Sequence, residues 1–327
     1  GIDDLTAFAI DTNMVGTVYG TGAINIIEAQ SENSFSLGGT ELIADSVKLT
    51  QLLHGCTYNL LTGEFTGLDQ EFQIPLSQET GNYVLLASGT DNATQNNSML
   101  AALRDSLGNS TDPVLILTGT NQTLANSLKT MLETTGTCTA EIFEASASTA
   151  SDAILHEKIS SAKKILLAGN TWSVFQSFLN GQNGILLRNK LKSNGMISAF
   201  VGDNSRFAGK KIVDNYLEPG AAYYAELTFP NGMQLLSESI IMPNTYLNND
   251  IYENTITSVP YAMLQNQIRY GFWLTNKNFM VYKPVNGKTY VTSYGTAPIM
   301  IATNKAGLGG FSRSEERRVG KECRSRW

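Results

Sequence analysis

The chain has 327 residues, a length that allows two or three domains, and a formal net charge of −6. Its last fifteen residues, Arg313–Trp327, resemble a translated sequencing-library adapter and are predicted to be a non-native tail. Without that tail, 17 of the 23 basic and 26 of the 29 acidic residues remain, a net charge of −9. Such an acidic chain argues against nucleic acid as a partner, and the lack of a long apolar run argues against a membrane span.

Residues 1–66 show the pattern of a small β-rich segment. Short runs rich in β-branched and aromatic residues predict the strands Thr6–Ile10, Thr17–Val18, Ala23–Glu28 and Lys48–Leu53. Residues 67–80 carry no such pattern and are predicted to be a linker to the rest of the chain.

In residues 81–312, apolar runs of strand length alternate with helical patterns. The predicted strands are Val84–Ala87, Val114–Leu117, Ala140–Phe143, Lys164–Ala168 and Met196–Val201. The predicted helices are Ser98–Leu107, Thr123–Thr134, Ala150–Ala162, Ser173–Leu179, Ile185–Ser193 and Ser205–Tyr216. This alternation predicts an α/β domain of three layers, with a parallel sheet between two layers of helices. After Leu217 the pattern changes to strands and hairpins, with Asn231-Gly232 and Asn286-Gly287 as turn signals.

Two segments near the ends of the chain repeat each other. Tyr19–Ile27 recurs as Tyr294–Ala302, and Gly1–Thr6 parallels Gly271–Asn276, with offsets of 275 and 270 residues. A period this long favours tandem domains over a solenoid. We therefore expect residues 1–66 to be the β-rich C-terminal end of a first domain, and residues 81–312 to be a second domain of the same kind.

The cysteines and the asparagine triplets carry little chemistry. Cys56 and Cys138 are too far apart in sequence for a zinc or redox motif and are predicted to be small buried or half-buried residues. Four N-x-S/T triplets, in a chain with few charges, hint at an extracytoplasmic surface and leave the location of the protein open: Asn92, Asn96, Asn109 and Asn121.

The segment from Gly195 to Ser205 is the most informative part of the sequence. The apolar strand Met196–Val201 leads through a glycine-containing turn to the helical pattern Ser205–Tyr216, which is the order of elements in a nucleophile elbow. Such a bend needs small neighbours because the strand and helix backbones approach closely there. The bend of this chain instead carries large or charged side chains: Phe200, Val201, Asp203, Arg206 and Phe207.

Three segments resemble the motifs of one known family. Gly1–Ala7 resembles its G-I-D-E-x-T-A, Val18–Ala23 resembles its V-x-G-x-G-A strand, and Ile165–Trp172 resembles its strand and loop ending in G-G-N-T-F or G-G-D-Q. The family is that of cyanophycinase and dipeptidase E, serine exopeptidases on a class I glutamine amidotransferase-like α/β fold. The resemblance, which covers nearly all of residues 1–312, implies that fold and a serine peptidase ancestry.

The chain departs from this family at the residues that carry the chemistry. The family's G-T-S-A-G-A elbow, laid on without gaps, places Val201 where the serine should be, and a four-residue slip places Ser205 there instead. The family's D-x-H-F base corresponds to Ile240–Thr245, which has no histidine. The resemblance therefore implies a non-catalytic second domain that is a structural or ligand-binding partner of an active first domain. The alternative is an active serine exopeptidase that uses Ser205.

Further residues have both a functional and a structural interpretation. The Gly169-Asn170-Thr171 loop follows a predicted central strand, where open α/β sheets bind ligands, so it is a candidate site for a peptide or small molecule. Its structural alternative is the cap of the following helix. Ser205 has the same alternative, because serine is a preferred N-cap residue. The only two histidines, His54 and His156, are expected to be structural or surface residues, and no metal or cofactor is predicted.

Overall fold

The computed structural model describes residues 1–2, 5–20, 23–29, 34–38, 41–45, 48–52, 54–66, 81–90, 103–107, 111–119, 121–134, 138–224, 226–246, 251–285, 288–295, 297 and 299–304. The predicted linker 67–80, the tail 313–327 and the triplets at Asn92, Asn96 and Asn109 lie outside these ranges.

A seven-stranded sheet forms the centre of residues 81–304, in the order β11-β10-β12-β13-β9-β16-β17. Its strands are β9 (Val84–Ser88), β10 (Val114–Thr118), β11 (Ala140–Glu144), β12 (Lys164–Leu167), β13 (Ile197–Phe200), β16 (Asn278–Val285) and β17 (Lys288–Gly295). The first five are parallel, and the β16–β17 hairpin adds to β9 in the antiparallel direction. The five predicted strands are confirmed as a parallel set, and the antiparallel hairpin makes the whole sheet mostly parallel.

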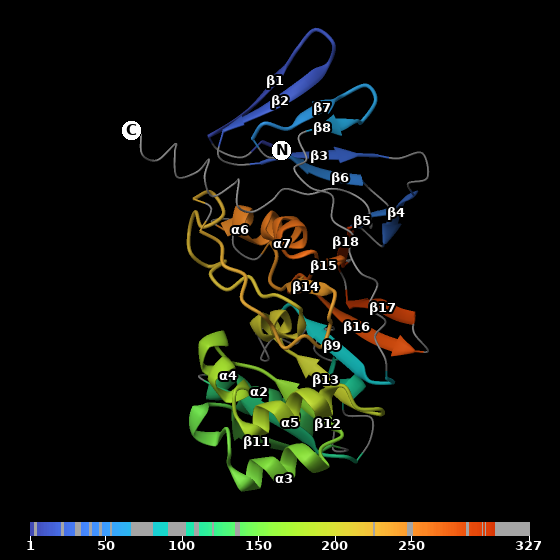
Figure 1. Ribbon diagram of the computed structural model, residues 1–327. Coiled ribbons are helices and arrows are strands. Elements are labelled where there is room, and N and C mark those ends of the chain that lie inside the picture. The colour runs from blue at the N-terminus through green and yellow to red at the C-terminus, as the bar shows by residue number, and fades with distance from the viewer. Residues whose placement is uncertain are drawn as a thin grey trace.

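Helices cover both faces of this sheet (Figure 1). One face packs against residues 103–107 and α2 (Gln122–Glu133), and the other against α3 (Ala153–Ser161), α4 (Trp172–Leu179) and α5 (Gln182–Leu191). Neighbouring residues of one strand enter opposite cores: Ile165 and Leu167 contact the α3–α5 side, whereas Leu166 contacts the α2 side. All of β10 is buried, as a strand covered on both faces requires. The three-layer α/β prediction is confirmed.

Beyond residue 217 the sequence prediction is only partly correct. The β16–β17 hairpin and a second sheet of three strands are present, the latter built from β14 (Ser239–Met242), β15 (Tyr270–Trp273) and β18 (Met300–Thr303). Two helices that the pattern did not indicate, α6 (Tyr252–Ile256) and α7 (Ser258–Asn266), lie between β14 and β15. Asn231-Gly232 does not join two regular strands; the Gly232 N–H instead donates to the Lys210 carbonyl. None of the described helices is long and apolar enough to span a membrane.

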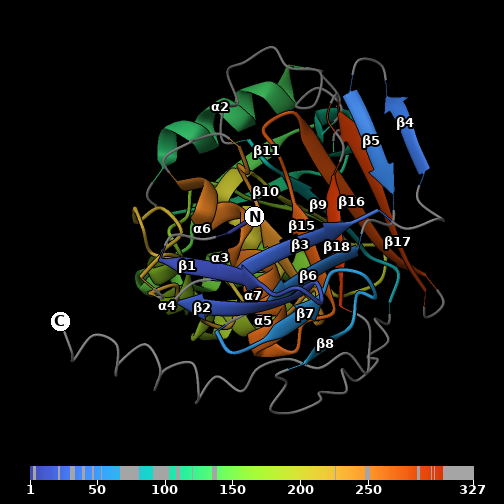
Figure 2. The same cartoon turned by 90° about the horizontal axis from the view of Figure 1, so that it is seen from above.

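The described part of residues 1–66 is built from strands, as predicted. Four of them form a sheet in the order β1-β2-β7-β8, and the others form two pairs, β3–β6 and β4–β5. The strands are β1 (Thr6–Ile10), β2 (Val15–Gly20), β3 (Ile24–Glu28), β4 (Ser34–Gly38), β5 (Glu41–Asp45), β6 (Lys48–Leu52), β7 (Thr57–Asn59) and β8 (Phe65–Thr66). Val18, Ile24, Leu52, Cys56 and Tyr58 form a small core of their own. β3 and β6 lie over the end of the molecule that carries α6 and α7 (Figures 1 and 2).

Candidate functional site

The bend after β13 turns at a glycine. Val201 remains extended, with φ −104° and ψ 130°, and Gly202 takes the left-handed region with φ 60°. The left-handed region favours glycine because it has no Cβ. In a nucleophile elbow the strained residue between strand and helix is the one that bears the reactive oxygen. The gapless sequence register placed this position at Val201; the turn falls one residue later, at a residue with no side chain.

The predicted helix Ser205–Tyr216 is not present. Gly202–Ala208 forms a 3₁₀ helix, η2, and the chain then runs alongside residues 228–239. The N–H groups of Lys210, Ile212 and Asp214 donate to carbonyls of Ser239, Pro230 and Thr228, at 2.7, 3.0 and 3.1 Å. Because these donors are committed to another segment, they cannot form the bonds of an α-helix. The strand–turn–helix expected of an elbow is therefore incomplete.

Ser205 is a buried hydrogen-bond donor inside η2. Its side chain is 0% exposed, and its Oγ lies 2.6 Å from the Ser88 carbonyl oxygen and 2.9 Å from that of Phe200. Both partners are acceptors, so the single hydroxyl hydrogen is shared between them. The cap interpretation of Ser205 is wrong, because the N-cap of η2 is Val201. Ser205 ties the bend to the ends of β9 and β13.

Both imidazoles of the chain make their contacts away from the bend. His54 Nδ1 accepts the Gly20 N–H at 3.1 Å, which places any proton of the neutral ring on Nε2. His156 Nδ1 lies 3.0 Å from Asn183 Oδ1, between α3 and α5. Both histidines are exposed, as expected for structural or surface residues. A serine hydroxyl needs an adjacent base to become a nucleophile, and neither of these contacts involves Ser205.

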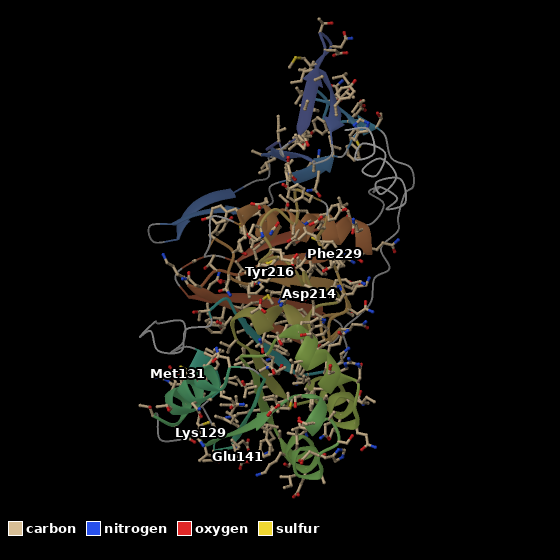
Figure 3. All side chains as sticks on the ribbon, turned by 90° about the vertical axis from the view of Figure 1, so that its left-hand side faces the viewer. Lys129, Met131, Glu141, Asp214, Tyr216 and Phe229 are labelled. Carbon is tan, nitrogen blue, oxygen red and sulfur yellow. The ribbon has the colours of Figure 1, made fainter. Side chains whose placement is uncertain are left out.

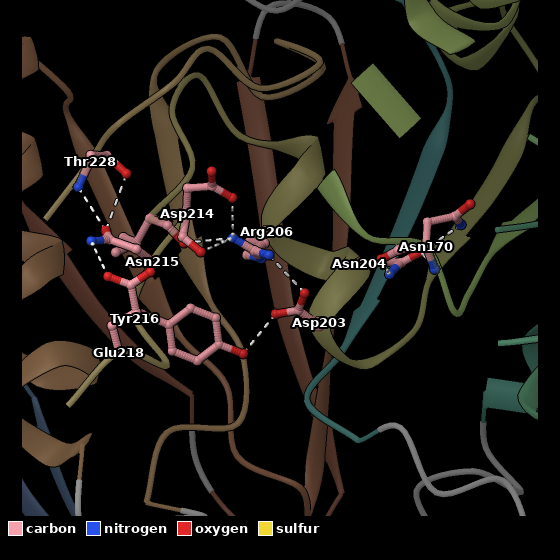
Figure 4. A network of polar contacts seen from close by, with 10 residues as sticks. Asn170, Asp203, Asn204, Arg206, Asp214, Asn215, Tyr216, Glu218 and Thr228 are labelled. Atoms are coloured by element: carbon pink, nitrogen blue, oxygen red, sulfur yellow. Dashed lines mark hydrogen bonds and ion pairs between the residues drawn. The ribbon is translucent and has the colours of Figure 1, made fainter. Parts of the chain in front are cut away.

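A buried arginine fixes the conformation of the bend, a role that the sequence pattern did not predict (Figure 4). Arg206 is 6% exposed, and its guanidinium donates to the Val213 carbonyl at 2.6 Å and to Asp203 Oδ2 at 2.9 Å. The hydroxyl of Tyr216 donates to the other oxygen of Asp203 at 2.7 Å, and Arg206 lies over the Tyr216 ring at 5.3 Å. The i,i+3 spacing of Asp203 and Arg206 was the available sequence signal. Figure 3 shows Tyr216 close to Asp214 and Phe229 in the middle of the molecule.

Phe207 is a core residue rather than an obstruction. From the sequence, Phe207 is one of the large side chains at a bend that was expected to need small neighbours. Because η2 winds as a 3₁₀ helix, Phe207 points toward α4, where its ring lies 5.0 Å from that of Trp172 and 5.5 Å from that of Phe175. The Phe207 side chain is 0% exposed.

The Gly169-Asn170-Thr171 loop joins β12 to α4 beside the bend. Two amides connect the loop and the bend: Asn170 Nδ2 donates to Asn204 Oδ1 at 2.8 Å, and Asn204 Nδ2 donates to the Asn170 carbonyl at 3.0 Å. Gly169 has φ 70°, and a Cβ there would lie 2.8 Å from Asn121. The loop therefore has a fixed backbone at the carboxyl edge of the parallel sheet.

Two polar features of this loop lack a hydrogen-bond partner among the described residues. Asn170 is 4% exposed, and its Oδ1 accepts no hydrogen bond among the described residues. Thr171 is exposed and is the N-cap of α4, as the structural interpretation predicts, but its side chain makes no cap hydrogen bond. The first N–H groups of α4 therefore lack a side-chain acceptor from the cap residue. A helix N-terminus in this condition favours an anionic group.

The described residues contain no group of three His, Cys, Asp or Glu side chains that could hold a metal ion. Cys56 and Cys138 are buried, as predicted. Burial also raises the pKa of the Cys138 thiol, which lowers its reactivity at neutral pH.

No family model matches the chain, and no curated protein matches it. Two solved structures are similar in shape at low identity. A provisionally assigned peptidase E from Listeria monocytogenes EGD-e is 11% identical, with a TM-score of 0.47 over 66% of this chain and 100% of that one. A peptidase from an acI-B1 Actinobacterium is 12% identical, with a TM-score of 0.48 over 71% of this chain and 98% of that one. Because both TM-scores lie below 0.5, the fold described above rests on this chain's own strand order and registers.

Proposed function

We propose that this chain is a cyanophycinase-like serine peptidase homologue whose α/β unit, residues 81–312, is non-catalytic and acts as a structural or ligand-binding partner of an active unit. The observation that carries the proposal is the bend after β13. Gly202 occupies the turn, and the Oγ of Ser205 is buried and bonded to two carbonyl oxygens. The assignment to the family is supported by the three segments that resemble its motifs, Gly1–Ala7, Val18–Ala23 and Ile165–Trp172.

An active serine exopeptidase would need Ser205 in another state. Its hydroxyl would have to leave the carbonyls of Ser88 and Phe200, and a base would have to reach it. The next two residues, Arg206 and Phe207, are also buried. Arg206 forms an ion pair with Asp203, and the ring of Phe207 contacts that of Trp172. Release of the serine would therefore disturb both neighbours, so the partner role is the better-supported function.

The ligand of such a partner would bind at the Gly169-Asn170-Thr171 loop. The N-terminus of α4, to which Thr171 gives no side-chain cap bond, favours a carboxylate. A peptide, which carries a carboxylate, fits this feature better than a neutral sugar does. The candidate ligand class is therefore a short peptide.

We expect acidic or basic dipeptides to raise the melting temperature of the chain, and sugars to leave it unchanged. A ligand at 100 times its Kd stabilises a protein by about 2.7 kcal/mol, which differential scanning fluorimetry resolves as a shift of a few degrees. Thr171→Asp should remove this shift, because its own carboxylate would cap α4. Thr171→Asn is the matched control that can cap the helix without adding charge, and we expect it to weaken binding less. An equal shift in Thr171→Asp and the native chain would contradict the site, and no shift with any dipeptide would leave only the structural role.

A further inference from the structure

In two hairpins of the chain, a glycine lies unusually close to the backbone of the facing strand. The β1–β2 hairpin ends at Gly20 and the β16–β17 hairpin at Gly295, with positive φ of 124° and 114°. A Cβ on Gly20 would lie 2.0 Å from the Leu5 carbonyl oxygen, and one on Gly295 would lie 2.2 Å from that of Lys277. Only glycine fits either position.

The surroundings of the two hairpins also correspond. Asn25, in the strand that follows the first hairpin, pairs with Gly1 through hydrogen bonds of 2.7 and 2.8 Å in the two directions. In the second unit, Ala302 of β18 pairs with Gly271 of β15, again antiparallel. In both places the strand after the hairpin returns to the segment before it. The sequence repeat is therefore accompanied by a repeated local structure.

The hairpins differ at one edge. β16 pairs with β17 on one side and with β9 on the other. In the part of the chain that the structure describes, β1 pairs with β2 and stands at the edge of its four-stranded sheet. Counted from the paired glycines, Ala7–Ile10 corresponds to Phe279–Tyr282, the four residues that pair with β9. The edge that β9 covers in one unit has no strand beside it among the described residues of the other.

The uncovered edge is apolar. Phe279 and Met280 are 0% exposed beside β9, whereas Ala7 and Ala9 are exposed and Ile10 is 51% exposed. β1 contains no charged residue and no proline, which are the usual protections of an edge strand. The β1–β2 hairpin also projects away from the seven-stranded sheet (Figure 1).

We propose that the outer edge of β1 is a docking site for the apolar β9-like strand of a second α/β unit built like residues 81–304, so that β1 takes the place that β16 has beside β9. That strand would pair antiparallel with Ala7–Ile10, as β9 pairs with β16. The side chains of that strand would be uncharged and apolar on both faces, like those of Val84–Ser88, because the strand would have a core on each side. The inference rests on the proposed function for the kind of partner unit and requires nothing about catalysis in either unit.

The test uses the full chain and a synthetic peptide that carries the sequence Asn82–Gly89 between pairs of lysines. We expect saturating peptide to slow amide hydrogen exchange in residues 6–10 at least tenfold, measured by mass spectrometry or NMR. The double variant Ala7→Lys/Ile10→Lys should weaken peptide binding at least tenfold, because charge on an edge strand opposes pairing. Leu61→Lys, at a residue 75% exposed outside β1, is the matched control and should bind as the native chain does.

Unchanged exchange in residues 6–10, or equal binding by the double variant, would overturn the inference. Slowed exchange that depends on protein concentration without peptide would also overturn it, since the occupant would then be a second copy of this chain. Circular dichroism checks that the double variant is folded, and both substituted residues are exposed. Neither readout involves serine reactivity, so failure of strand docking and failure of the non-catalytic proposal are distinguishable.

Discussion

Replacing Arg206 with alanine is expected to destabilise the α/β unit by about 3 kcal/mol, near the lower end of the range for a broken buried ion pair. The guanidinium is 7% exposed and lies 2.9 Å from Asp203, whose side chain is 25% exposed. Its loss removes the charged donor to that carboxylate, which Tyr216 also contacts, and the donor to the buried Val213 carbonyl. Both changes take hydrogen bonds away from buried or partly buried acceptors. Urea denaturation followed by far-UV circular dichroism measures the change.

Arg104→Ala is the matched control for this substitution. Arg104 also lies 2.9 Å from an aspartate, Asp105, but their side chains are 29% and 64% exposed. An ion pair at the surface contributes about 0 to 1 kcal/mol. Equal effects of Arg206→Ala and Arg104→Ala would contradict the structural role of the buried arginine.

Phe207→Ala is expected to cost about 3 to 5 kcal/mol, the range for deletion of a buried aromatic ring. Phe207 is 0% exposed and contacts the rings of Trp172 and Phe175, so its removal leaves a cavity between η2 and α4. Thermal or urea unfolding measures the loss.

Phe207→Leu distinguishes a ring that packs in the core from a ring that blocks the bend. Leucine keeps most of the volume and is expected to cost less than about 2 kcal/mol, since hydrophobic replacements of similar size are tolerated. If Phe207 instead blocked a working bend, Phe207→Ala would leave stability unchanged and increase serine reactivity. That result would contradict the core role assigned to this ring.

The central sheet was predictable because each strand carries a local signal. Val114–Leu117 is apolar throughout, as a strand with helices on both faces must be, and the structure buries all of β10. The β16–β17 hairpin was likewise indicated by the Asn286-Gly287 pair in the sequence between its two strands. α6 and α7 were missed because Asn, Thr and Ser interrupt the helical periodicity over Tyr252–Asn266.

The bend was harder to predict because its conformation depends on distant partners. Ser205–Tyr216 has a helical pattern, yet Lys210, Ile212 and Asp214 bond to residues 228–239, which the local sequence does not reveal. The role of Arg206 likewise depends on Asp203 and on a carbonyl of the following segment. Sequence reasoning placed Phe207 among side chains too large for such a bend, although that side chain is part of the core.

The reactivity of the chain toward a fluorophosphonate probe is the most direct test of the non-catalytic proposal, because such a probe needs an activated serine and no knowledge of the substrate. With Gly202 at the bend and Ser205 bonded to two carbonyls, we predict no labelling above that of the heat-denatured chain, under conditions where trypsin is fully labelled. A buried hydroxyl with two acceptors and no neighbouring imidazole has no route to a covalent bond with the reagent. Labelling of the folded chain that disappears in Ser205→Ala, with that variant shown to be folded, would contradict the proposal.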